Sequence, residues 1–257
     1  MRTTSIINLK GGVGKTITSV NLAYQLCQRG NRVLVIDCDK QGNTSRFFKA
    51  YGYDNNSLAE ILTGEAIITE TAIRYCVTEN DKGLLDVIPA NMNLLSAHRE
   101  IALNIPRPQQ TTRLKMALDE VRDYYDYCII DCAPDINISV INALVASDDV
   151  IIPTTIDEFS LDGINEIMQQ VRDTQKYYPQ LLFIGCLITK YRNDDFQNEG
   201  IEEIENMCGK VFDTKISYTN MVSKSTFVRE PLTIFSPRCK AAKCYVKFTD
   251  EYIASRR

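Results

Sequence analysis

The stretch "SIINLKGGVGKTI", residues 5–17, decides the fold of this chain. It combines a short strand, a turn rich in glycine, and a helix that begins at Lys15. Glycine has no Cβ atom, so the backbone of the turn can adopt positive φ and direct successive N–H groups into one concavity. The positive end of the following helix strengthens this anion site. A strand, turn and helix in this order predict a loop that binds phosphate groups.

The residues around the turn predict a magnesium–nucleotide site. Lys15 is placed to reach the β- and γ-phosphates of a nucleotide, and the Thr16 hydroxyl is a candidate Mg²⁺ ligand. Backbone N–H groups around the phosphates are expected from five neighbouring residues: Gly11, Gly12, Val13, Gly14 and Ile17. The general form of this loop has glycine at the position of Leu9, so the loop is either incomplete or of a different class.

Apolar runs of strand length alternate with helical patterns along almost the whole chain. Strands are expected at residues 5–8, 32–37, 84–88, 127–131, 150–154, 182–189 and 211–216. Several of these are continuously apolar, as strands buried on both faces are. Helices are expected at residues 15–28, 57–62, 92–102, 137–146 and 160–178. The alternation predicts an α/β fold, a doubly wound and mainly parallel sheet with helices on both faces, in a single domain spanning residues 1–257.

The composition narrows the class of protein. A net charge of -4 argues against a chain wrapped in nucleic acid, although a local basic patch could still bind phosphates. The nine cysteines are scattered without a C-x-x-C pair and His98 is the only histidine, which favours buried thiols in a reducing cytosol. An iron–sulfur ligand role stays open for two pairs: Cys128 with Cys132, and Cys239 with Cys244. No leader peptide or apolar run of about 18 residues is present, so a cytoplasmic protein is expected.

Two further motifs end expected strands in carboxylates. "VLVIDCDKQGNTS", residues 33–45, places Asp37 and Asp39 after one strand, and "YDYCIIDCAPD", residues 125–135, places Asp131 after another. Parallel strands share the edge at which their carboxyl ends lie, so these side chains are expected to face the phosphates. Asp131 is a candidate to hold Mg²⁺ opposite Thr16. For Asp37 and Asp39 the alternative is a purely structural role in capping the turn.

The segment K-G-G-V-G-K-T, residues 10–16, resembles the deviant Walker A motif of the ParA/MinD group of ATPases, and D-C-D-K-Q-G-N, residues 37–43, resembles its ParA branch. The resemblance covers nearly the whole chain and implies ATP and Mg²⁺ as cofactors. It implies that Lys10 reaches across a nucleotide-sandwich homodimer to the partner's ATP. It also implies that Asp39 positions or activates the attacking water and that Asp37 supports the magnesium shell. The candidate catalytic residues are therefore Lys10, Lys15 and Asp39. The chain departs from the family pattern at Ile17, Lys40 and Asp135.

The resemblance extends to the later segments. "IIPTTIDEFSLDGI", residues 151–164, is similar to the segment that lines the dimer face in the family. "LITKY", residues 187–191, and "ISYTN", residues 216–220, fall where relatives contact adenine, which makes candidates of four residues: Thr189, Lys190, Ser217 and Thr219. The implied activity is hydrolysis of ATP to ADP and phosphate, slow without a partner.

The family's partners are implied as well. An ATP-bound dimer is expected to bind DNA without sequence preference and, with a ParB-like centromere-binding adaptor, to position plasmid, mobile-element or chromosome DNA at the nucleoid. Basic residues gather in the C-terminal region and are candidates for this DNA surface: Lys224, Arg229, Arg238, Lys240, Lys243 and Lys247. The segment at residues 192–203, where relatives often have an arginine that contacts DNA, is acidic instead. A solvated helix face explains the basic residues as well as a DNA-binding surface does.

Three other interpretations compete with partition. A MinD-like ATPase that positions cargo at the membrane should end in an amphipathic helix, and Asp250 and Glu251 in the last segment disfavour it, so no stable membrane association is expected. A relative that carries a metal cluster would use paired cysteines. A DNA-binding module without catalysis leaves four residues unexplained: Lys15, Thr16, Asp39 and Asp131.

Overall fold

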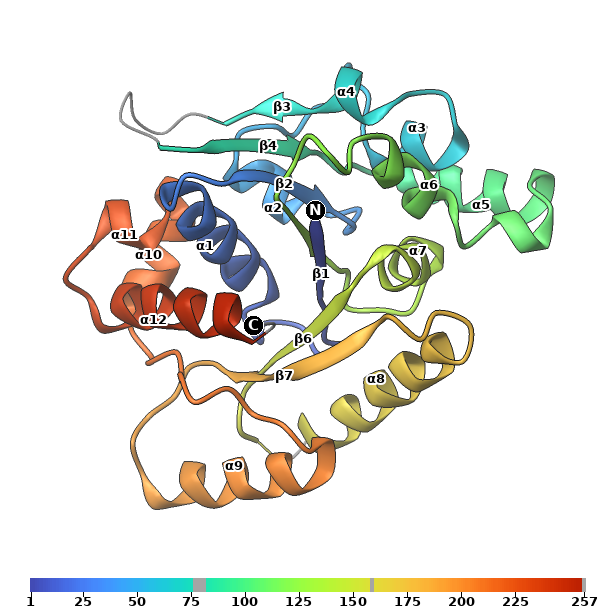
Figure 1. The fold of residues 1–257 in the computed structure, drawn as a ribbon. Coiled ribbons are helices and arrows are strands. Elements are labelled where there is room, and N and C mark those ends of the chain that lie inside the picture. Colours follow the sequence, from blue (N-terminus) through green and yellow to red (C-terminus); the bar gives the residue numbers. More distant parts are fainter. Residues whose placement is uncertain (76–81, 158–159, 256–257) are drawn as a thin grey trace.

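The computed structural model describes residues 1–75, 82–157 and 160–255 (Figure 1). The strands are β1 (Arg2–Ile6), β2 (Arg32–Asp37), β3 (Ile73–Arg74), β4 (Leu84–Ile88), β5 (Tyr127–Asp131), β6 (Asp149–Thr154) and β7 (Leu182–Ile188). They form one sheet in the order β3-β4-β2-β5-β1-β6-β7. Every neighbouring pair is parallel except β3 with β4 at one edge.

Helices cover both faces of this sheet (Figure 1). They are α1 (Lys15–Gln28), α2 (Asn43–Phe47), α3 (Leu58–Thr63), α4 (Ile68–Thr71), α5 (Leu94–Asn104), α6 (Arg113–Glu120), α7 (Ile138–Ala146), α8 (Ser160–Gln175), α9 (Asp195–Cys208), α10 (Asn220–Val228), α11 (Leu232–Phe235) and α12 (Lys240–Ala254), with a short 3₁₀ turn at Arg107–Gln109. The predicted fold class, a doubly wound and mainly parallel α/β sheet, is confirmed.

Successive side chains of the central strands pack alternately into two hydrophobic cores, one on each face of the sheet. In β2, Val33 and Val35 join the core on the face covered by α1 and α12. Leu34 and Ile36 join the core on the opposite face, with α3, α5 and α7. Successive side chains of a strand point to opposite faces, so a strand with helices on both sides must be apolar throughout. This requirement is why "VLVID" carries no polar residue until Asp37, where the strand ends.

Most expected elements are present with small shifts at their ends. The strand expected at residues 5–8 is β1, which spans Arg2–Ile6, and β7 ends at Ile188. Ser57 caps α3 together with Glu60, and Asn137 caps α7, so both helices begin one residue later than expected. The helix expected at residues 92–102 is Leu94–Asn104. The helix expected at residues 160–178 ends at Gln175. Its start was expected to be capped by the side chain of Ser160, which lies outside the described part of the structure.

The strand expected at residues 211–216 is wrong. This segment forms only isolated bridges beside β7, such as the one between Val211 and Cys186. The Glu251 carboxylate accepts hydrogen bonds from the backbone N–H groups of Asp213 (2.6 Å) and Thr214 (3.0 Å). Backbone donors that bond to a side chain cannot continue a strand ladder. Several helices were not expected, among them α6, α9, α10 and α12.

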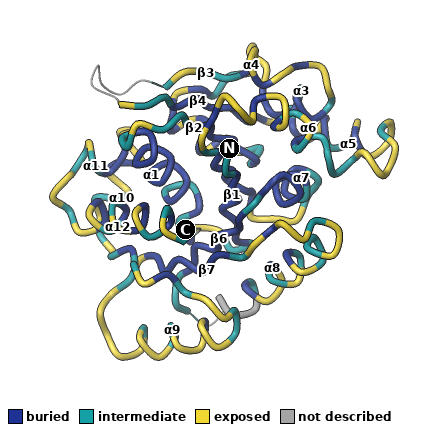
Figure 2. The backbone as a smooth tube through the Cα atoms, in the orientation of Figure 1, coloured by how far each residue is buried: buried dark blue, intermediate teal, exposed yellow. Residues whose placement is uncertain are grey.

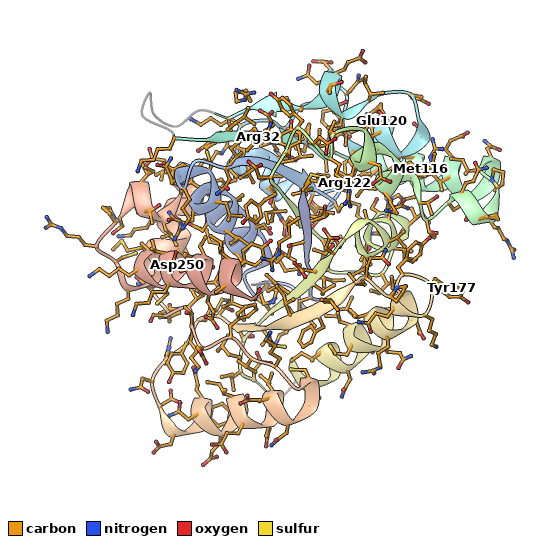
Figure 3. The ribbon with its side chains drawn as sticks, viewed as in Figure 1. Arg32, Met116, Glu120, Arg122, Tyr177 and Asp250 are labelled. Carbon is orange, nitrogen blue, oxygen red and sulfur yellow. The ribbon has the colours of Figure 1, made fainter. Side chains whose placement is uncertain are left out.

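Helix α12 is packed into the core beside α1 (Figures 1 and 2). Its large apolar side chains Tyr245, Phe248 and Tyr252 are almost fully buried. On its outer side Asp250, labelled in Figure 3, forms an ion pair at 2.5 Å with Arg29, the residue that caps the C-terminus of α1. The apolar face of the C-terminal helix is therefore used within the fold. Within the described residues, no helix is both long and apolar enough to cross a membrane.

Candidate nucleotide-binding site

The glycine-rich turn joins β1 to α1 at the edge where β1, β2 and β5 all end. Gly12 and Gly14 adopt left-handed φ values of 75° and 91°, which a residue with a Cβ adopts only under strain. Gly14 is the N-cap of α1, and no side chain caps this helix. The first N–H groups of α1 and of the turn are consequently available to an anion.

A cleft of about 730 Å³ lies directly over this turn. The turn and the first residues of α1 contribute six residues to its lining: Gly11, Gly12, Gly14, Lys15, Thr16 and Ile17. Segments after β2, β5 and β7 and helix α10 supply the other walls: Asp39, Gln41, Asn43, Phe47, Cys132, Pro134, Lys190, Val222, Ser223, Thr226 and Phe227. Among the predicted loop residues, Val13 is the exception, because it is buried, and its carbonyl accepts a hydrogen bond from Thr189 Oγ1 at 2.7 Å.

Lys15 lies mostly buried at the floor of the cleft. Its Nζ donates to the Lys10 carbonyl at 3.0 Å. Burial lowers the pKa of this ammonium, and the nearby Asp131 carboxylate opposes that shift. A buried cation that donates one hydrogen bond within the described residues is suited to a phosphate ligand, which would supply further negative partners.

The Asp131 carboxylate is the centre of a cluster of hydroxyl groups. Thr16 Oγ1 and Thr44 Oγ1 donate to its Oδ2 at 2.8 and 2.6 Å, and Ser19 Oγ donates to its Oδ1 at 3.1 Å. Burial raises the pKa of Asp131, while the hydroxyl groups and Lys15 oppose the rise. Thr16 and Asp131, predicted to share Mg²⁺, are therefore in direct contact.

Asp37 and Asp39 differ sharply in their surroundings. Asp37 is fully buried, and it accepts hydrogen bonds from Asp39 N (3.0 Å), Ser45 N (2.8 Å) and Ser45 Oγ (2.7 Å). Burial and the neighbouring Asp131 raise the pKa of Asp37 to about 8. Asp39 instead lines the cleft, and its carboxylate accepts from Gln41 N at 2.9 Å within a tight turn. Of these two aspartates, Asp39 is the one that faces the cleft.

Lys10 is directed away from the cleft of its own chain. Its Nζ forms an ion pair with Asp157, which follows β6, and Thr155 Oγ1 donates to the same carboxylate at 2.8 Å. The Lys10 backbone N–H donates to Asn8 Oδ1 at 2.9 Å. Among the described residues, Lys10 is not part of the cleft lining. The side chains of residues 158–162, which are part of the predicted dimer-face segment, lie outside the described part of the structure.

The four predicted adenine contacts line a smaller cavity of about 80 Å³ beside the main cleft. The residues concerned are Thr189, Lys190, Ser217 and Thr219. The two cavities share wall residues, among them Gly14 and Ile17. Residues from the ends of β7 and of the segment after α9 thus meet the phosphate loop, although they lie more than 170 positions later in the chain.

Several residues of the site were not singled out from the sequence. The buried hydroxyls of Ser19, Thr44 and Ser45 belong to the carboxylate cluster. The sequence does offer an indication for two of them, because Thr44 and Ser45 directly follow the Q-G-N segment. The apolar wall of Phe47, Val222 and Phe227 had no such signal.

The residues present fit a magnesium–nucleotide complex. Hydroxyl and carboxylate oxygens are the protein ligands that Mg²⁺ prefers, and Thr16 with Asp131 offers both. A Cβ atom added at Gly11 or Gly12 would meet nothing within 4 Å, so the space above the turn is open to phosphate. Within the described part of the chain, no three histidine, cysteine or acidic side chains lie close enough together to share a metal ion.

Comparisons with known proteins agree with this site. A family model described as an AAA domain matches residues 1–184. The chain is 36% identical over 257 residues to the sporulation initiation inhibitor protein Soj of Bacillus subtilis, covering 98% of both chains. It is 31% identical to the chromosome partitioning protein ParA of Caulobacter vibrioides, covering 100% of this chain and 96% of that one.

A solved structure shares the fold along the whole length. It is cobyrinic acid a,c-diamide synthase from Mycobacterium smegmatis with a bound ATP analog and magnesium, with a TM-score of 0.85 and 25% identity, covering 100% of this chain and 96% of that one. The family resemblance seen in the sequence is confirmed. With its phosphate loop, its paired Thr16 and Asp131, and full-length similarity to Soj and ParA, the chain belongs to the ParA/Soj/MinD family of partition ATPases.

Proposed function

We propose that residues 1–257 form a single ATPase domain that binds and hydrolyses ATP as a homodimer and partitions DNA. The observation that best supports this is the convergence of three strand ends on one cleft. The loop after β1 brings Lys15 and Thr16, β2 leads to Asp39, and β5 ends in Asp131. These are the residue types that phosphoryl transfer from ATP requires.

The candidate site residues in and beside the cleft have defined tasks in this proposal. The backbone N–H groups of the turn and Lys15 hold the phosphates, and Thr16 and Asp131 hold Mg²⁺, with Asp37 supporting the shell from behind. Bound Mg²⁺ neutralises charge on the β- and γ-phosphates. Asp39, which faces the cleft, orients the attacking water. The base is held by four residues of the smaller cavity: Thr189, Lys190, Ser217 and Thr219.

Lys10 acts on the ATP of the partner subunit in this scheme. Within one chain its ammonium is held by Asp157 and lies outside the cleft lining of the described residues. In the ATP-bound dimer the Lys10 ammonium leaves Asp157 and contacts the phosphates of the ATP in the partner subunit. There it stabilises the negative charge that develops on the phosphate oxygens during hydrolysis. Hydrolysis is therefore expected to be slow in the isolated monomer.

ATP-dependent dimerisation is the first test. The purified chain should be monomeric without nucleotide and with ADP, and dimeric with Mg²⁺ and a non-hydrolysable ATP analogue, as measured by light scattering. Lys15→Ala should abolish both the dimer and ATP hydrolysis, because Lys15 is the buried phosphate cation. A wild-type chain that neither dimerises nor hydrolyses ATP would contradict the proposal.

The dimer is proposed to bind DNA through the basic C-terminal region and to work with a ParB-like adaptor at the nucleoid in the cytoplasm. The six basic residues on α10–α12 and their connections are exposed. A twofold axis would double this surface and raise its avidity. Binding should fall steeply with salt and weaken in the double variant Lys240→Glu, Lys243→Glu.

A matched control changes the same amount of charge elsewhere. Arg122→Glu with Lys176→Glu replaces two exposed cations outside α10–α12 and should leave DNA binding close to wild type. Equal loss in both double variants would mean that net charge, and not this surface, governs binding. Stable membrane association is not proposed, since α12 buries its apolar face, and vesicle sedimentation with ATP tests this.

A further inference from the structure

Two consecutive hydroxyl residues at the start of α2 contact the terminal aspartates of two neighbouring strands. Thr44 Oγ1 donates to Asp131 Oδ2 at 2.6 Å, and Ser45 Oγ donates to Asp37 Oδ2 at 2.7 Å. Asp37 and Asp131 are themselves register partners in the β2–β5 pair. Ser45 Oγ also accepts from the backbone N–H of Ala90 at 2.8 Å. Helix α2 is thereby fixed to the sheet through polar contacts that are fully buried.

The three hydroxyl groups that donate to the Asp131 carboxylate differ in whether they can contact a ligand in the cleft. Thr16 lines the cleft and can itself contact a metal ion. Thr44 and Ser19 are fully buried and do not belong to the cleft lining of the described residues. They restrain the two carboxylate oxygens separately, Thr44 at Oδ2 and Ser19 at Oδ1. A hydrogen bond of this kind orients a metal-binding carboxylate without touching the metal.

Thr44 also links the turn that holds Asp39 to the Asp131 carboxylate. The turn that holds Asp39 closes through Gly42 N to Asp39 O at 2.8 Å, and α2 follows at once with Arg46 N bonded to Gly42 O at 2.8 Å. The turn that carries Asp39 and the Asp131 carboxylate are thus connected through one side chain, Thr44.

We propose that Thr44 is a positioning residue for magnesium: its hydroxyl holds the Asp131 carboxylate in the orientation that binds the Mg²⁺ of Mg–ATP. This inference rests on the proposed ATPase function. Loss of such an outer hydrogen bond typically weakens metal affinity by roughly 10- to 100-fold. Loss of the Thr44 hydroxyl should therefore weaken Mg²⁺ binding and leave binding of the metal-free nucleotide nearly unchanged.

The test uses Thr44→Val, which keeps the side-chain shape and removes the donor. Binding of a fluorescent non-hydrolysable ATP analogue is titrated with Mg²⁺, and binding without divalent ions is measured in EDTA. The half-saturating Mg²⁺ concentration should rise at least about 10-fold, while metal-free binding stays within about twofold of wild type. Thr44→Ser retains the hydroxyl and should restore the wild-type Mg²⁺ midpoint.

Thr18→Val is the matched control. Thr18 is equally buried, and its hydroxyl bonds to the Tyr245 hydroxyl at 3.2 Å instead of to a carboxylate. This variant should keep the wild-type Mg²⁺ midpoint whatever its thermal stability. If Thr44→Val does not fold, Thr44→Ala is compared with Thr44→Ser in the same titration.

The outcomes separate the inference from the function on which it rests. An unchanged Mg²⁺ midpoint in a folded Thr44→Val protein, with or without a lower melting temperature, overturns the positioning role and leaves the ATPase proposal intact. A wild-type protein whose nucleotide binding ignores Mg²⁺, or that binds no nucleotide, overturns the proposed function itself and this inference with it.

Discussion

The two ends of the cleft are built in opposite ways. At the phosphate end, buried polar groups are held by short hydrogen bonds, as in the contacts of Thr16 and Thr44 with Asp131. At the end proposed to hold the base, most of the wall comes from the C-terminal third of the chain and remains open, with Tyr218 49% exposed and Phe227 88% exposed. The phosphate end is preorganised for chemistry by strand ends and a tight turn, whereas the base end leaves large apolar groups in solvent.

The difference predicts where substitutions are costly. A buried carboxylate that loses a partner is left with an uncompensated polar group, so changes at the phosphate end should strongly affect rate or metal binding. Exposed contacts at the base end should contribute modest affinity. The predictions below begin with the largest expected effect.

Lys10→Ala should reduce ATP hydrolysis on the order of 10³-fold, because a cation supplied to the transferred phosphate contributes 10³ or more in rate. Binding of ATP to the monomer should change little, since Lys10 is paired with Asp157 and lies outside the described lining of the cleft. Steady-state hydrolysis and equilibrium binding measure the two effects. Lys176→Ala, directly after the end of α8, serves as the control. A normal rate in Lys10→Ala would contradict the assignment.

Asp39→Asn should lower the rate of hydrolysis by about 10²-fold or more, because the amide cannot accept a proton from water in the transition state. The amide oxygen can still accept the hydrogen bond from Gln41 N, so the turn should persist. The ATP-bound dimer should therefore accumulate, which light scattering detects. Asp54→Asn, an exposed aspartate, is the control. Wild-type turnover in Asp39→Asn would remove Asp39 from the chemistry.

The pH dependence of stability should report the buried charge at the phosphate end. The pKa of Asp37 is raised to about 8 by burial and Asp131, so the folded protein holds a proton that the unfolded chain releases near pH 4. Its contribution to the free energy of unfolding is present at low pH and is lost as pH rises through about 8.

Urea unfolding without Mg²⁺, from pH 5 to 8, measures this dependence. The free energy of unfolding should decline less with pH in Asp37→Asn than in wild type, because the variant has no carboxylate to ionise. Asp54→Asn should behave like wild type. Parallel curves for Asp37→Asn and wild type would show that Asp37 keeps an ordinary pKa.

Ser217→Ala should have the smallest effect. Loss of one hydroxyl contact to the base should weaken ATP binding by roughly 2- to 10-fold and leave turnover at saturating ATP unchanged. Inorganic pyrophosphate has no base, so its binding should not change. A large loss of turnover in Ser217→Ala would mean that the two ends of the cleft are not independent.

The phosphate end could be predicted from the sequence because its geometry is local. The glycines at 11, 12 and 14 form the turn after β1, Asp37 and Asp131 end β2 and β5, and Asp39 follows β2. Parallel strands bring these ends together. The contacts of Thr44 and Ser45 depend on the register of β2 with β5, which no local pattern encodes. The strand expected at residues 211–216 failed because a distant side chain, Glu251, takes its backbone donors.

The base end could be located only through the family resemblance. Thr189 and Ser217 sit in loops whose closeness to the phosphate turn is a product of tertiary packing. The exposed Phe227 at the mouth of the cleft carries no periodic or motif signal at all. Sequence reasoning therefore predicted which side chains meet at the cleft, and it did not predict the shape of the pocket.

A mixing experiment tests the central claim, that Lys10 serves the ATP of the partner subunit, most directly. Lys10→Ala and Asp39→Asn proteins, each inactive alone, are combined in equal amounts with Mg²⁺ and ATP. In a mixed dimer one site regains both an intact Asp39 and the partner's intact lysine, so hydrolysis should recover to about a quarter of the wild-type rate. If the mixture stays as inactive as its components although mixed dimers form, Lys10 acts within its own chain and the account is wrong.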